Sequence, residues 1–424
     1  MYSIKENIKL MKYILSIIIF SINILYSDIY AQIPKSFSED DAGFINTFTS
    51  YLSSNNRPES KESAIWIKTN LTSKVSSDDL AQIKATATLM LQKKVPLWPR
   101  FNDYAIYLQT IGGQSNLDQT IVSQNHKILL QFLQNEGTDG VKQFYQYMEY
   151  LTTHYAKKAI YIDKTKSWYT TQFYKIEIKD QLPLYVFDKM DLIGETTSDS
   201  LIIKNTSGTF NPMTNEWIGN SGNISWRRVG YKEEDVFVDF KKYQIDLSKP
   251  EILLDTVDFS FKPYVTAPIK GKFEDKLFTS KSIASNYPQF TSFDKVALKI
   301  SDNVQLESGI GIEGIKLYAT STGRAEPARL TILNSKKEKI IEAEANKYFI
   351  NNFKEIDGAK AKVNFAFIDS TTIFHPSSTL TYNVETKSLK ITRENTNDAK
   401  IPFIAPFFKM ILYVDQFEWN IDSN

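Results

Sequence analysis

The stretch VFVDFKKYQIDL, residues 236–247, decides the fold class of most of this chain. Up to Phe240 its side chains alternate between two faces in steps of two, as they do along a β-strand. The apolar series then resumes at Tyr243, one step out of phase. Because a one-residue slip turns the side chains of a strand to its other face, the pattern predicts a bulge or bend near Lys241-Lys242.

The period of two extends from about residue 158 to the end of the sequence. Alternating faces recur at 257–261 and 363–367, and residues 380–391 have the pattern of a hairpin. Gly, Asn, Ser and Pro separate many short segments of this kind. We therefore predict an elongated β domain over 158–424, either an antiparallel sandwich or a β-solenoid or jellyroll.

The end of this domain has the pattern of an uncapped sheet edge. Residues 413–419 (YVDQFEW) predict a strand, and only a short stub follows it. Sheets and solenoids normally protect their edges with a cap, a bulge or a covering segment. The pattern leaves open that the domain is truncated and that the sequence is a piece of a longer protein.

Before residue 158 the apolar residues follow a helical period. Phe44, Phe48, Leu52 and later stripes of this kind are spaced three or four residues apart. Acidic or capping residues at 39–41, 77–79 and 138–139 precede these stripes and are typical of helix starts. The sequence predicts a helical domain over 32–157, built as a bundle of five or six helices. The fold class is thus α+β, with an N-terminal helical bundle followed by a long all-β region.

The first residues predict export. Lys5, Lys9 and Lys12 precede the uncharged run YILSIIIFSINILY at 13–26, and the small residue Ala31 follows. This order is typical of a secretory signal peptide, which we place at 1–31. The alternative is an uncleaved anchor, but the run is shorter than the roughly 20 residues of a membrane span. We expect an exported protein that is periplasmic, outer-membrane-associated or secreted, with no spanning segment after the signal peptide.

Composition excludes several classes of function. The 50 basic and 49 acidic residues leave a net charge of +1, so bulk charge does not favour nucleic acid. Cysteine is absent, which excludes disulfides, a thiolate nucleophile and a lipid-modified cysteine. The three histidines stand far apart in the sequence and form no zinc motif. We expect neither a cofactor nor a metal, and we find no catalytic signature.

The segment EWIGNSGNISWRRVG, residues 216–230, is the densest group of aromatic, glycine and basic residues. Trp217, Trp226 and Arg227 are our candidate binding residues, because exposed indoles stack on sugar rings and arginine packs beside them. The alternative is that both indoles pack within the sheet, as tryptophan more often does. Carboxylates from Glu233 to Asp258 offer a candidate hydrolytic pair, and His375 is expected in a turn.

Two resemblances follow from these segments. Residues 206–230, which contain WIGNSGNISWRRVG, resemble large exported proteins of Bacteroidota that have no assigned function. Within residues 342–391, the segments AEANKY, DGAKAKV and LTYNVETKSLKI resemble the β-jellyroll units of lipopolysaccharide-transport proteins of the organic-solvent-tolerance type. The second resemblance implies stacked strands around an open apolar groove for acyl chains.

Three functions remain open at this point. The first is a non-enzymatic cell-envelope protein, in which a β scaffold or binding module carries a helical domain that docks an envelope protein partner. The second is a lipid or lipopolysaccharide carrier, which predicts an open channel lined by Phe259, Phe261, Phe365 and Phe367. The third is a glycan-binding or glycan-hydrolysing protein, which predicts exposed indoles at Trp217 and Trp226.

Overall fold

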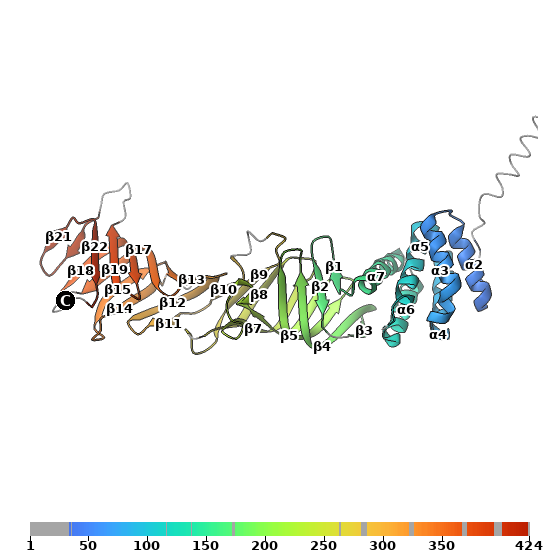
Figure 1. Ribbon diagram of the computed structural model, residues 1–424, viewed down its shortest axis with the longest axis horizontal. Helices are drawn as coiled ribbons and strands as arrows, with labels where there is room; N and C mark the ends of the chain where they lie inside the picture. The colour runs from blue at the N-terminus through green and yellow to red at the C-terminus, as the bar shows by residue number, and fades with distance from the viewer. Residues whose placement is uncertain are drawn as a thin grey trace, which may run out of the picture. The chain divides into compact units, whose positions relative to one another are not determined.

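The chain divides into two compact units, and the boundary follows Lys158. We call the residues before this boundary the helical unit and those from Ala159 onward the β unit (Figure 1). The predicted signal peptide at 1–31 lies outside the described residues. The computed structural model describes residues 34, 36–115, 117–136, 138–171, 174–262, 264–280, 286–321, 326–366, 371–393 and 401–422.

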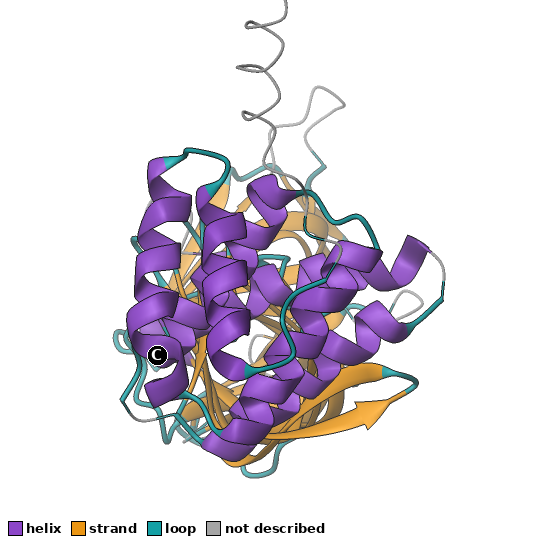
Figure 2. Cartoon of the chain, turned by 90° about the vertical axis from the view of Figure 1, so that its right-hand side faces the viewer, coloured by secondary structure: helices purple, strands orange, loops and turns teal. Residues whose placement is uncertain are grey.

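The helical unit contains six α-helices within the described residues, as the helical period predicted. A short helical turn, η1 (Leu97–Phe101), precedes the fourth of them. Figure 2 looks onto this unit, and its helices (purple) lie side by side. The helices are α2 (Asp41–Ser53), α3 (Pro58–Lys74), α4 (Ser77–Gln92), α5 (Asn102–Gly112), α6 (Gln119–Gln134) and α7 (Thr138–Lys157).

Helix starts follow the capping residues of the sequence. The carboxylate of Asp40 accepts a hydrogen bond from the backbone N–H of Gly43 at 2.7 Å. The hydroxyl of Ser76 accepts one from the N–H of Asp79 at 3.1 Å. These bonds satisfy N–H groups that the first turn of a helix leaves without an intrahelical partner. The cap of α4 is therefore Ser76 rather than the predicted Ser77.

The interior of the helical unit holds polar groups as well as apolar stripes. The amide of Asn125 in α6 donates to the hydroxyl of Tyr155 at 2.6 Å and accepts from the hydroxyl of Tyr147 at 2.6 Å. His126 is 1 % exposed, its ring lies 5.7 Å from that of Tyr107, and neither ring nitrogen has a hydrogen-bond partner among the described residues. Burial lowers the pKa of His126 to about 4, because the charged ring would lose its hydration.

The β unit contains 22 strands within the described residues. The first eleven are β1 (Tyr161–Ile162), β2 (Ser167–Thr170), β3 (Lys175–Lys179), β4 (Leu182–Glu195), β5 (Ser200–Asn211), β6 (Glu216–Ser225), β7 (Val236–Asp246), β8 (Glu251–Phe261), β9 (Ile269–Lys276), β10 (Gln289–Ser292) and β11 (Val296–Ser301). The others are β12 (Val304–Glu313), β13 (Lys316–Thr320), β14 (Ala328–Leu333), β15 (Lys339–Ala345), β16 (Lys347–Asn351), β17 (Glu355–Ala366), β18 (Thr372–Asn383), β19 (Ser388–Arg393), β20 (Phe403–Ala405), β21 (Met410–Leu412) and β22 (Gln416–Asn420).

Within the described residues, the strand pairings are antiparallel, and β4 to β10 pair in chain order. Farther along, long strands pair with two neighbours on one edge. The first half of β12 pairs with β14 and its second half with β13, while β17 pairs first with β16 and then with β15. Such splitting produces a sandwich-like sheet with an apolar interior. The antiparallel pairing favours the predicted sandwich over a solenoid of parallel coils.

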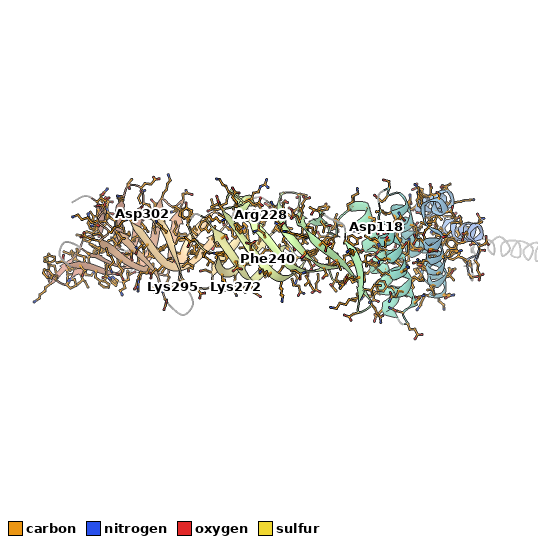
Figure 3. The ribbon with its side chains drawn as sticks, turned by 90° about the horizontal axis from the view of Figure 1, so that it is seen from below. Asp118, Arg228, Phe240, Lys272, Lys295 and Asp302 are labelled. Carbon is orange, nitrogen blue, oxygen red and sulfur yellow. The ribbon has the colours of Figure 1, made fainter. Side chains whose placement is uncertain are left out.

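The sequence predicted a bulge or bend in β7, and the structure has a bend, because the register with β6 continues unbroken across Lys241 and Lys242. Lys242 has φ of 51°, in the left-handed region that non-glycine residues rarely adopt. Lys241 and Lys242 are both exposed, whereas Phe240 and Tyr243 on either side of them are buried (Phe240 is marked in Figure 3). Because Lys241 and Lys242 are both turned outward, the apolar residues of both halves of β7 lie inside the sandwich. Asn205 of β5 also has a positive φ, of 53°.

Near the C-terminal end, one prediction is confirmed and another is wrong in part. The hairpin predicted at 380–391 forms between β18 and β19, where Tyr382 pairs with Leu389. The strand predicted over 413–419 forms only in its second part, because β22 begins at Gln416 and residues 413–415 connect it to β21. Between them the carboxylate of Asp415 accepts a hydrogen bond from the Arg393 guanidinium at 2.6 Å, which fixes the connecting segment.

Candidate binding pocket

A pocket of about 320 Å³ lies on the β unit beside the short helical turn η2 (Trp226–Val229), which follows β6. Strands β5, β6 and β9 supply the rest of its wall, together with the loop that precedes β7. Apolar residues of β5 and β6 form one side of it. Its charged lining residues are Lys204, Arg227, Arg228, Glu233 and Asp275.

The turn η2 is held by the burial of its first residue. The indole of Trp226 lies 5.2 Å from the ring of Phe259 and 5.6 Å from that of Phe273, so it anchors the turn to the core. Gly230 ends the turn with φ of 99°, a conformation that residues with a Cβ rarely adopt. With Trp226 turned inward, the side chain of Arg227 points outward and is 74 % exposed.

Arg228 closes the floor of the pocket and is marked in Figure 3. Its Nη1 donates to Asp199 at 3.0 Å and to the backbone carbonyl of Lys276 at 3.1 Å, and its Nη2 donates to Asp275. Both carboxylates are buried, with side chains 7 % and 1 % exposed. Burial raises the pKa of Asp275 to about 6, although the charge of Arg228 opposes that rise. Arg228 is thus engaged by the protein itself.

The guanidinium of Arg227 makes fewer contacts with the protein than that of Arg228 does. Among the described residues its guanidinium has one ion-pair contact, 3.9 Å from Glu233, which is longer than a hydrogen bond. The other oxygen of Glu233 is taken by Lys204. The planar donors of Arg227 are therefore free to bind a carboxylate or phosphate group in two-point fashion, with Lys204 beside them.

The structure separates the three predicted binding residues. Arg227 lines the pocket, but Trp217 and Trp226 are both 0 % exposed. Trp217 donates its Nε1–H to the hydroxyl of Tyr243 at 2.8 Å inside the sandwich. A sugar ring needs an open indole face, so the expectation of exposed indoles is wrong for both residues. Both indoles instead pack within the sheet, as the alternative interpretation of this segment predicted.

Sequence reasoning missed the acidic partners of Arg228. A signal for one of them was present, because Asp275 stands in phase with the buried residues Ile269 and Phe273 of β9. A charged residue at a core-facing position predicts a buried partner. Asp199 offers no such signal, since it precedes β5 in a loop. Its partner lies 29 residues away in sequence.

The other candidate chemical groups are not assembled into a site. Asp239 and Asp258 pair across β7 and β8 at exposed positions and do not line the pocket. His375 lies buried in β18, not in a turn, and its Nε2 is 3.0 Å from the carbonyl of Ile401. Within the part of the chain that the structure describes, no group of acidic residues and histidines could hold a metal ion.

The rings expected to line a lipid channel are packed in the core. Phe259, Phe261 and Phe365 are 0 %, 1 % and 2 % exposed, and Phe367 lies outside the described residues. The ring of Phe259 stacks on that of Phe290 at 4.2 Å. The expectation of an open channel is therefore wrong at the three described positions.

Comparisons of the chain with protein-family models, with curated proteins and with solved structures found no match. The two resemblances given for residues 206–230 and 342–391 stay predictions. Within the described residues, the helices are all too short or too polar to cross a membrane. The function is accordingly inferred from the geometry of the chain's own residues.

Proposed function

We propose that this chain is a non-enzymatic, exported cell-envelope protein whose β unit is a rigid binding module for an anionic group. The observation that carries the proposal is the state of Arg227. Its guanidinium is largely exposed at the rim of a pocket, while both terminal nitrogens of the neighbouring Arg228 are bonded to the carboxylates of Asp199 and Asp275. Two adjacent arginines with such different surroundings indicate one structural and one ligand-binding side chain.

The charges of the pocket favour an anion. Three basic residues line the pocket, Lys204, Arg227 and Arg228, against two acids, Glu233 and Asp275. A carboxylate or phosphate placed between Arg227 and Lys204 would accept charge-assisted hydrogen bonds from both. We take the ligand to be a carboxylate-bearing or phosphate-bearing group of an envelope partner or glycan.

The packed core supports binding at the surface rather than transport through an interior groove. Rings that would have to line a channel contact one another instead, as Phe259 does with Phe261 and Phe290. A filled sandwich resists deformation, because side chains in such cores are close-packed. The helical unit has its own core and is, in this proposal, the part that docks an envelope protein.

The test is a calorimetric titration of the full chain with inorganic phosphate, a glucuronate oligosaccharide and a neutral oligosaccharide of equal length. We expect the anions to bind and Arg227→Ala to weaken binding at least tenfold, about 1.4 kcal/mol. Arg329→Ala is the matched control, because Arg329 is an exposed arginine on β14. Equal affinities for Arg227→Ala and the unaltered chain would refute the assignment, as would binding of the neutral sugar alone.

A further inference from the structure

The segment IPFIAPFFKMILYV, residues 401–414, combines strong hydrophobicity with exposure. It forms the hairpin of β20 and β21, with residues 406–409 in the turn, and β21 lies at the far end of the β unit in Figure 1. Phe407 and Tyr413 are 72 % and 73 % exposed, and Phe408 is 57 % exposed. Apolar runs of this length are usually buried or interfacial segments. Here only Phe403 and Ala405 of β20 are buried, and most of the other apolar side chains of the segment are exposed.

From the geometry of this hairpin we propose that residues 401–414 form a membrane-anchoring hairpin that inserts into the interfacial layer of a lipid bilayer. An aromatic side chain carries roughly 150–250 Å² of surface, so the three exposed rings alone offer on the order of 400 Å². That already equals the largest apolar patch of a typical monomer. Five exposed aliphatic and thioether side chains of the same segment enlarge it: Ile401, Ile404, Met410, Ile411 and Val414.

The distribution of these residues favours lipid over a protein groove. Met410 and Ile411 are neighbours on β21 and are 51 % and 57 % exposed. Successive side chains of a strand point to opposite faces, so both faces of β21 are apolar and exposed, whereas β20 packs Phe403 and Ala405 on the core. A protein surface would cover one face and leave the other in water. A lipid layer can cover both faces of β21 and the turn while β20 stays packed on the β unit.

The charge of the hairpin also favours binding to lipid. Residues 401–414 contain one basic residue, Lys409, and no acidic residue. An ammonium group beside the two phenyl rings of the turn can reach anionic headgroups while its methylene groups stay in the apolar layer. The next charged group is Asp415, which is paired with Arg393 and marks the polar base of the hairpin.

The depth of insertion is limited by the backbone. The strand β21 pairs with β20, and no pairing of its outer edge is present among the described residues. Unpaired backbone groups are costly in hydrocarbon but are satisfied by water and headgroups at the interface. Tyr413 at the base is typical of that layer, where aromatic residues with a polar end accumulate. The hairpin is thus an interfacial anchor rather than a membrane span.

The absence of cysteine makes a site-specific test available. In the full chain, Phe407→Cys is labelled with an environment-sensitive nitrobenzoxadiazole dye and mixed with vesicles of phosphatidylethanolamine and phosphatidylglycerol at 3:1. We expect the emission to rise at least twofold and shift to the blue. Ile315→Cys is the matched control, since Ile315 is 60 % exposed between β12 and β13, and its label should not respond. An unresponsive label at 407 would overturn the proposal.

Flotation with the same vesicles gives the second measurement. Phe407→Ser/Phe408→Ser should lower the bound fraction of the full chain at least fivefold, whereas Leu253→Ser/Ile315→Ser, which also removes two exposed apolar side chains, should not change it. Unchanged flotation of the first variant would assign binding to another part of the chain and contradict the proposal. A dimer seen by light scattering that this variant dissociates, without vesicle binding, would identify a second copy as the occupant. These outcomes are independent of anion binding at Arg227.

Discussion

The helical unit and the β unit bury polar groups in opposite ways. In the helical unit, buried polar groups bond neutral partners: Asn125 bonds two tyrosine hydroxyls, and the buried carboxylate of Asp79 accepts from the hydroxyls of Ser76 and Ser123. In the β unit, charges are buried, with Arg228 between Asp199 and Asp275. Helices satisfy their backbone internally and need few side-chain bonds between them. Sheet segments that are far apart in the chain are held together by contacts between their side chains. The ion pairs of Arg228 with Asp199 and Asp275 are contacts of this kind.

The sharpest test of this contrast compares the two adjacent arginines. Arg228→Ala leaves two buried carboxylates without their partner, and we expect a loss of about 3–5 kcal/mol in the free energy of unfolding. Arg227→Ala removes an exposed side chain and should change stability by about 0.5 kcal/mol or less. Urea unfolding monitored by tryptophan fluorescence measures both. Equal losses would show that the buried ion cluster does not stabilise the β unit.

A neutral network should be less costly to break. Asn125→Ala removes the amide that bonds two buried tyrosine hydroxyls, and we expect the helical unit to lose roughly 2–3 kcal/mol. Asn46→Ala, at an exposed position of α2, is the control and should be close to neutral. Helix ellipticity during thermal unfolding reports the change. A loss larger than that of Arg228→Ala would reverse the order of the two units.

Lowering the pH should change the stability of the two units in opposite directions. His126 has a folded pKa of about 4, below the value near 6.5 of an unfolded histidine, so protons bind the unfolded chain first and the helical unit loses stability as the pH falls. From pH 7 to pH 5 this amounts to about 2 kcal/mol. Asp275 has a folded pKa of about 6, above the value near 3.9 when unfolded, so the folded β unit takes up protons and gains about 1 kcal/mol over the same range.

Hydrogen exchange resolved along the chain measures this divergence. Amides of α6 should exchange faster at pH 5 than the intrinsic rates predict, and those of β9 slower. His126→Leu should remove the first effect, and Asp275→Asn the second, which identifies the titrating groups. A parallel response of both units would mean that other groups control the pH dependence.

The smallest expected effect concerns a helix start. Ser76→Ala removes the hydroxyl that accepts from the N–H of Asp79, and we expect the helical unit to lose about 1 kcal/mol. Ser77→Ala, the next residue along, is the control and should be neutral or slightly stabilising, because Ser77 lies inside α4 and alanine has the higher helix propensity. The melting temperature of the helical unit distinguishes them. A larger loss for Ser77→Ala than for Ser76→Ala would place the cap at Ser77, where the sequence pattern had put it.

The sequence predicted the site only in part, and the reason is physical. Arg227 was recognisable because it stands in a dense group of unusual residues. The partners of Arg228 lie 29 and 47 residues away from it, on elements that meet only when the sheet has formed. Whether Trp217 and Trp226 are exposed was equally undecidable, since a tryptophan in a strand fits either face. Burial depends on what covers a face, which periodicity does not contain.

The sequence by itself determined the α+β class, the order of helices before strands, and the slip in β7, where Lys242 takes a positive φ. These features depend on residues within one or two turns of helix or a few strand positions, so local spacing is sufficient to define them. Tertiary structure alone decided which arginine is buried and that the phenylalanines fill the core. It also decided that most of the apolar side chains of residues 401–414 remain exposed, although the segment is as apolar as a core strand. Each of these outcomes depends on contacts between segments that are distant in the chain.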